Sequence, residues 1–201
     1  MLIINQTNYC NIIYQKSETE RSVVNNLVVL IDGYLDRERL NRAKCEINDI
    51  ITTVSTLEIK RELTLVISSD GGDMGPCIDF VNWLKKDAIN NFSNVVAKIY
   101  TASSGAALIA LTTTIRTIST YGVFGLHIGS IKVEASDVDA NGVLDKRLAK
   151  LLKESRKKIF QLLDKAGISL SPEILSRLDA AGQFIFSPEE CVETGICSKI
   201  F

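Results

Sequence analysis

Strand-like and helix-like segments alternate along the first half of the chain, and this alternation constrains the fold more than any other feature. Residues 23–31, 63–68 and 95–100 are short runs rich in Val, Ile and Leu, which are typical of buried strands. Between them, residues 37–54 and 77–84 carry apolar side chains three or four positions apart, which predicts an amphipathic helix in each gap. Strands separated by helices favour β-α-β units and a mainly parallel sheet.

The second half continues the pattern in shorter pieces. Residues 105–113 predict a helix buried on every side, and residues 115–119 and 122–126 predict two short strands. A long amphipathic helix is expected over residues 143–166. Ser171 and Ser187 each precede a proline, which predicts two short capped helices around a strand at residues 184–186. We therefore expect one α/β domain.

The composition excludes several classes of protein. The chain has 201 residues, enough for one core, and its 23 basic and 24 acidic residues form no block of one sign. Nucleic acid and membrane surfaces are therefore not expected as partners. The sequence lacks a secretory signal pattern and a run of about 18 apolar residues, so a cytoplasmic protein is expected.

The cysteines suggest free thiols. They are five in number and form no Cys-x-x-Cys pair, which disfavours zinc and redox motifs. We expect buried free thiols in a reducing compartment, with no metal and no other cofactor. The residues are Cys10, Cys45, Cys77, Cys191 and Cys197.

Three short elements could carry chemistry. Ser103 and Ser104 lie between a predicted strand and a predicted helix, where unpaired backbone N–H groups can stabilise an oxyanion. His127, the only histidine, follows a later strand and could act as a general base. Gly71-Gly72 ends another strand and allows close approach of a ligand to the backbone. Each element alone has a plainer interpretation: a helix cap, a structural histidine or a tight turn.

Together, the three elements resemble the proteolytic subunit of the Clp protease. In that family a strand ends in a Pro-Gly-Gly turn, an Ala-Ala-Ser segment carries the nucleophile, and a His-Gln-Pro segment carries the base. The matching segments here are Ser-Asp-Gly-Gly at 69–72, Thr-Ala-Ser-Ser-Gly at 101–105, and His127. Residues 184–196, Phe-Ile-Phe-Ser-Pro-Glu-Glu-Cys-Val-Glu-Thr-Gly-Ile, also resemble the C-terminal segment of that family. The resemblance covers about residues 23–200.

The resemblance implies a fold and a set of site residues. The fold would be the α/β spiral of β-β-α units that Clp peptidases share with the crotonase superfamily. Ser103 would be the nucleophile and His127 its base, with the backbone N–H groups of Gly72 and Ser104 as oxyanion donors. Ser104 as the nucleophile, one position along, stays open.

The chain departs from the family at four places. Asp70 replaces the proline before the glycines, Ile-Gly follows His127 in place of Gln-Pro, and the base lies one residue nearer the nucleophile. Gln183 stands where the family has the third triad member, an Asp. A neutral amide accepts the imidazole Nδ1–H but cannot stabilise an imidazolium by charge. Asp179 is the fallback for this role.

The resemblance also implies a function. The chain would be an ATP-dependent Clp-type serine endopeptidase that degrades unfolded polypeptides inside a homo-oligomeric ring, heptameric or stacked, fed by an AAA+ unfoldase. Residues 1–22 would be an N-terminal segment, either an axial loop or disordered, and 129–142 a handle-like excursion from the peptidase domain at 23–201. A weakened or inactive ring subunit, suggested by Gln183, is the main alternative. A crotonase-type acyl-CoA enzyme is a further one.

Overall fold

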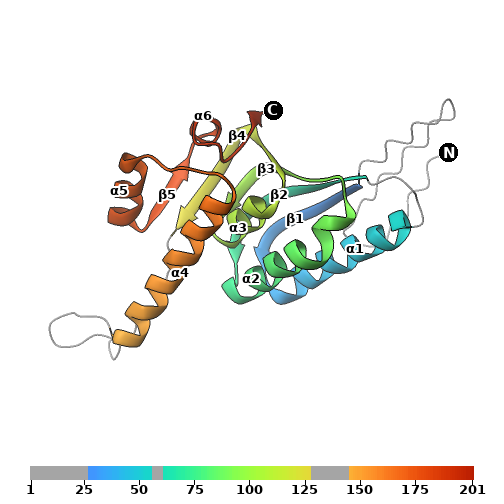
Figure 1. The fold of residues 1–201 in the computed structure, drawn as a ribbon, viewed down its shortest axis with the longest axis horizontal. Coiled ribbons are helices and arrows are strands. Elements are labelled where there is room, and N and C mark those ends of the chain that lie inside the picture. Colours follow the sequence, from blue (N-terminus) through green and yellow to red (C-terminus); the bar gives the residue numbers. More distant parts are fainter. Residues whose placement is uncertain (1–26, 56–60, 128–144) are drawn as a thin grey trace.

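The computed structural model describes residues 27–55, 61–127 and 145–201, so the segments predicted at 1–22 and 129–142 lie outside the described residues. A mainly parallel six-stranded sheet and flanking helices confirm the predicted α/β class (Figure 1). The strands and α-helices in chain order are β1 (Leu27–Leu35), α1 (Arg37–Ser55), β2 (Glu62–Gly72), α2 (Met74–Trp83), β3 (Asn94–Ser103), α3 (Gly105–Thr112), β4 (Ile115–His127), α4 (Lys146–Lys165), α5 (Pro172–Ala181), β5 (Gln183–Phe186), α6 (Pro188–Glu193) and β6 (Lys199–Ile200).

The strand order brings the candidate residues to one edge of the sheet. The path is β1-β2-β3-β4-β5, with β6 paired to β4. Strands β1 to β4 are parallel, and β5 runs antiparallel to β4. The carboxyl ends of the four parallel strands therefore meet at the same edge, which is where ligands bind in open α/β sheets. Gly72, Ser103 and His127 are the last residues of β2, β3 and β4.

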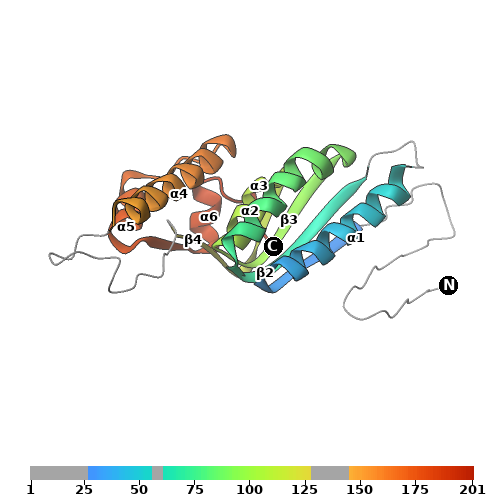
Figure 2. The ribbon, with the colours of Figure 1, turned by 90° about the horizontal axis from the view of Figure 1, so that it is seen from below.

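Helices cover one face of the sheet (Figure 2), and the core lies beneath them. The predicted apolar stripe of α1 is buried here at Leu40, Ala43, Ile47 and Ile50, and every residue of α3 is buried. On the opposite face, large side chains such as Leu30 and Tyr100 stay 48% exposed. One face of the strands is thus packed, while the other presents its side chains to the surroundings.

Three strands run further than the sequence predicts. β1 continues through Asp32-Gly33 to Leu35, and β2 includes residues 69–72, which were expected to form a turn. β4 is one strand in place of two, because a bulge absorbs the intervening residues: Ile99 pairs with Ile118 and Thr101 with Val123, so residues 119–122 stand opposite Tyr100 alone. Bulges of this kind leave no simple periodicity in the sequence.

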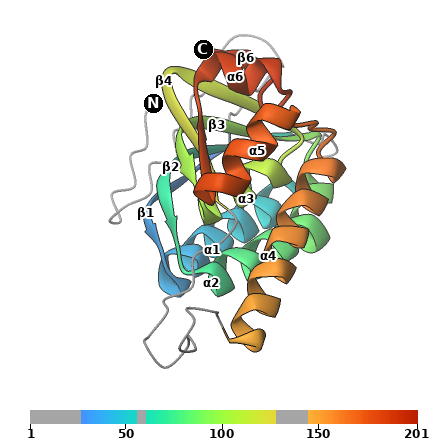
Figure 3. The ribbon, with the colours of Figure 1, turned by 90° about the vertical axis from the view of Figure 1, so that its left-hand side faces the viewer.

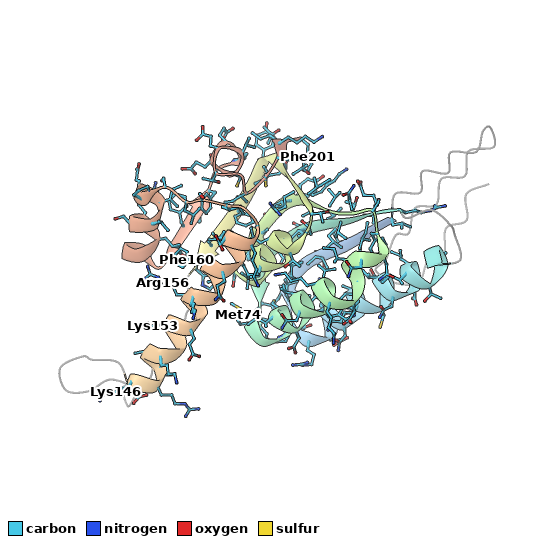
Figure 4. The ribbon with its side chains drawn as sticks, viewed as in Figure 1. Met74, Lys146, Lys153, Arg156, Phe160 and Phe201 are labelled. Carbon is cyan, nitrogen blue, oxygen red and sulfur yellow. The ribbon has the colours of Figure 1, made fainter. Side chains whose placement is uncertain are left out.

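The long helix predicted over residues 143–166 is α4, which begins after Asp145 and ends before Gly167 (φ 71°). Its Asp145 side chain accepts a hydrogen bond from the Arg147 N–H at 2.8 Å. α4 extends away from the sheet (Figure 3), so that Lys146 lies at its distant end and Phe160 near the body (Figure 4). Among the described helices, none combines the length and apolarity required to cross a membrane.

Candidate active site

Ser104 has a backbone conformation unlike that of any other described non-glycine residue. It occupies the N-cap of α3 with φ 55° and ψ −122°, and it is the only non-glycine with positive φ in the described ranges. Such a conformation costs about 1–3 kcal/mol and is concentrated at functional sites. A serine on a strained strand-to-helix turn is the nucleophile-elbow arrangement of several hydrolases. Ser103, by contrast, is the last residue of β3.

The Ser104 hydroxyl does not cap its helix. Three described helices begin after a serine, and two of these serines accept a hydrogen bond from the first turn: Ser171 from the Ile174 N–H and Ser187 from the Glu190 N–H, both at 3.2 Å. Ser187 and Glu190 also complete the expected capping box. The side chain of Ser104 makes no such bond. The plain interpretation of Ser104 as a capping residue therefore fails.

Gly71 packs from the side of β2 against residues 103–105, the strand-to-helix turn that is called the elbow below. A Cβ at Gly71 (φ +98°) would lie 2.7 Å from the Ser104 Cβ and 2.8 Å from the Ser103 carbonyl oxygen. Only glycine permits this approach, because both the space and the φ exclude a side chain. Ser69 fixes this end of β2, because its hydroxyl accepts from the Gly71 N–H at 3.0 Å and donates to the Gly33 carbonyl at 2.5 Å.

Two backbone N–H groups lie close together at the start of α3. The Gly105 nitrogen is 3.0 Å from the position of a Cβ at Gly71, and the Gly72 nitrogen is 4.0 Å from that of a Cβ at Gly105. The Ser104 N–H, which the sequence suggested as an oxyanion donor, instead donates to the Gly125 carbonyl at 3.1 Å. The candidate oxyanion donors beside this turn are therefore the N–H of Gly105, the first residue of α3, and the neighbouring N–H of Gly72.

Ser103 lies beside Gly125 of β4, which is two positions before the histidine. It pairs with Gly125, and its Oγ is 2.5 Å from the position of a Cβ at Gly125. Because side chains alternate along a strand, Gly125 and His127 face the same side of the sheet. Gly125 was missed by the sequence reasoning. A glycine inside a strand, the usual sign of close approach, was the available signal.

His127 is half-buried at the end of β4. Burial lowers the pKa of its imidazole below the ordinary value of 6.5, so the ring is neutral near pH 7. A neutral imidazole is the form that accepts a proton from a serine hydroxyl.

Gln183 is the direct cross-strand partner of His127. The antiparallel pairing of β4 with β5 sets these two residues directly opposite each other. The Cβ atoms of residues paired in this way are typically about 5 Å apart. Gln183 is exposed. Asp179, the fallback, belongs to α5, and its side chain lies outside the described part of the structure.

The Cys77 thiol does not offer a second nucleophile beside the serines. Cys77 packs directly beneath Gly105, and burial, assisted by the nearby Asp73, raises the pKa of its thiol to about 11. It therefore stays protonated at neutral pH. Cys191 and Cys197 are buried as well, whereas Cys45 is exposed. Within the described ranges, no group of His, Cys, Asp and Glu is arranged to hold a metal ion.

The comparisons with known proteins agree with the fold. No protein-family model and no curated protein sequence matches the chain. Among solved structures it is similar to a point mutant of ClpP1 from Listeria monocytogenes, with a TM-score of 0.65 and 20% sequence identity. The match covers 87% of this chain and 90% of that one. The chain has a ClpP-like, crotonase-like fold.

Proposed function

We propose that the chain is a serine hydrolase of the Clp-peptidase type that cleaves polypeptides, with Ser104 as the nucleophile. The observation that carries the proposal is the strained, non-capping Ser104 at the strand-to-helix turn beside Gly71-Gly72. Ser103 is the candidate that the sequence resemblance favours, and its Oγ lies over Gly125, on the face of β4 that also carries His127. We favour Ser104 because its φ is positive and the N–H that follows it belongs to the first residue of α3.

The mechanism follows from the site. His127 removes the Oγ proton of Ser104 while the oxygen attacks a peptide carbonyl. The N–H groups of Gly72 and Gly105 stabilise the resulting oxyanion. The tetrahedral intermediate collapses as the imidazolium of His127 gives its proton to the leaving amine, which forms an acyl-enzyme. A water molecule, deprotonated by His127, then hydrolyses the ester and restores Ser104.

Gln183 would complete the site as a weak third member. Its amide oxygen can accept the Nδ1–H of His127 and hold the ring in the tautomer that activates a serine. It supplies no negative charge to the imidazolium, and in trypsin-like enzymes replacing the triad Asp by Asn costs about 10⁴ in kcat. We therefore propose a functional but slow peptidase.

The second candidate is a Clp-like ring subunit with a structural or regulatory role, and Gln183 is the observation that favours it.

Both candidates would act within an oligomeric assembly. We extend the proposal to a homo-oligomeric ring that receives unfolded polypeptides from an AAA+ unfoldase, by analogy with the fold. The uncovered sheet face, with Leu30 and Tyr100, supports an interface. Light scattering at micromolar concentration tests this, and a strictly monomeric peak would contradict it.

Reaction with a fluorophosphonate separates the two candidates. A peptidase gains the mass of one phosphonyl group per chain, and the gain disappears in Ser104→Ala and His127→Ala. The same variants should lose hydrolysis of an unfolded, fluorescently quenched polypeptide. Absence of both labelling and hydrolysis in an assembled ring would support the structural subunit instead.

A further inference from the structure

A cavity of about 330 Å³ opens beside Gly71, at the carboxyl ends of β1, β2 and β3. Gly71 connects it to the elbow, since the same glycine touches Ser104. The side chains that line it are polar, and none is aliphatic: Tyr34, Ser68, Ser69, Asp70 and Thr101. A leucine-like side chain would gain little burial against such a lining.

Asp70 is the only charged residue in this lining. It is exposed and has no hydrogen bond or ion pair with any residue that the structure describes. The neighbouring carboxylates are already engaged: Asp73 accepts from the Tyr34 hydroxyl at 2.8 Å, and Asp32 pairs with Arg39. The charge of Asp70 is therefore the one available to a ligand in the cavity.

Tyr34 adds a second group suited to a cation. Its hydroxyl is committed to Asp73, and this hydrogen bond, with the adjacent charge, raises its pKa, so the phenol stays neutral. The ring of Tyr34 remains largely exposed in the cavity wall. An aromatic ring, a carboxylate and the hydroxyls of Ser68 and Thr101 are together the groups that recognise an ammonium or guanidinium.

We propose that this cavity binds a lysine or arginine side chain of the polypeptide substrate close to the scissile bond, and that Asp70 sets the preference. The proposal rests on the proposed function, because it takes Ser104 as the point of cleavage. It assigns to this chain a basic substrate position through Asp70, the residue that stands where the similar family has proline.

Binding of short peptides to the full-length Ser104→Ala protein tests the pocket without requiring turnover. Three fluorescent pentapeptides with alanine flanks differ only in a central Lys, Leu or Glu. We expect the Lys peptide to bind about tenfold more tightly than the Leu peptide, with the Glu peptide weakest. The advantage should shrink as salt is raised, because an exposed carboxylate is screened.

Variants at Asp70 decide the outcome. Asp70→Asn should reduce the Lys preference to less than twofold, and Asp70→Glu should retain most of it. Asp49→Asn makes the same charge change on α1, at a residue that does not line the cavity, and should leave the preference intact. Equal binding of the three peptides, or an unchanged Lys preference in Asp70→Asn, would overturn the proposal.

The failure of this proposal is distinguishable from that of the catalytic one. A chain that reacts with the fluorophosphonate yet binds Lys and Leu peptides equally refutes the pocket alone. A chain that binds the Lys peptide through Asp70 yet never reacts with the probe refutes catalysis and leaves the pocket supported as a binding site.

Discussion

Gln183 on β5 faces His127 on β4 as its direct cross-strand partner. Restoring a carboxylate there should add charge stabilisation to the imidazolium. We expect Gln183→Asp to raise kcat for peptide hydrolysis by about a hundredfold, less than the 10⁴ separating Asp from Asn in an optimised triad. Gln183→Asn, which keeps a neutral amide, is the matched control and should give no gain. A folded Gln183→Asp protein with an unchanged rate would remove Gln183 from the site.

Burial of His127 should be visible in its titration. Since the chain has a single histidine, one imidazole resonance reports it by NMR. We expect a midpoint below 6.5. The value of kcat/KM should fall as the pH drops through the same midpoint, because only the neutral ring accepts the Ser104 proton. A midpoint at or above 6.5 would contradict the lowered pKa.

The same shift predicts how stability depends on pH. Between the lowered folded pKa of His127 and 6.5, the unfolded chain binds more protons than the folded one. The contribution of His127 to the free energy of unfolding is therefore complete above 6.5 and is lost as the pH falls through this window. Urea unfolding of the native chain and of His127→Gln across pH 5–8 measures the difference, which should vanish if the pKa is unshifted.

Gly71 should be essential for the elbow. A Cβ there would overlap Ser104 and would require a left-handed φ from alanine, so Gly71→Ala should abolish peptidase activity. Gly75→Ala is the control, because a Cβ at that position of α2 meets nothing within 4 Å. It should leave activity unchanged and alter stability by less than about 1 kcal/mol. Equal losses in both variants would show that the Gly71 contact has no special role.

The serines at helix starts should separate stability from activity. Ser187→Ala removes a complete capping box and should cost about 1 kcal/mol of unfolding free energy with activity retained. Ser104→Ala removes a hydroxyl that caps nothing and should change stability by less than about 0.5 kcal/mol while activity is lost. Denaturant curves of the two variants check this. A cap-sized loss in Ser104→Ala would return Ser104 to a structural role.

Much of the fold could be predicted because its strands and helices have simple periodicities. The stripe of α1 from Leu40 to Ile50 and the wholly apolar α3 are direct consequences of sequence spacing. The continuation of β4 across residues 119–122 could not be predicted, since it depends on a bulge against β3.

The sequence could predict that the candidate residues lie at neighbouring strand ends, but it could not decide between the two serines. Two adjacent serines give the same sequence signal, and the choice between them depends on backbone angles. The positive φ of Ser104 accompanies contacts with Gly71 and Gly125, which come from strands distant in sequence. Local propensity carries no information about such contacts.

Mapping the phosphonylated residue tests the central claim most directly. The unmodified chain is treated with a fluorophosphonate and digested, and the peptide containing residues 101–105 is fragmented in a mass spectrometer. Fragment ions that separate Ser103 from Ser104 should place the adduct on Ser104, and labelling should persist in Ser103→Ala. An adduct on Ser103, or on neither serine, would contradict Ser104 as the nucleophile.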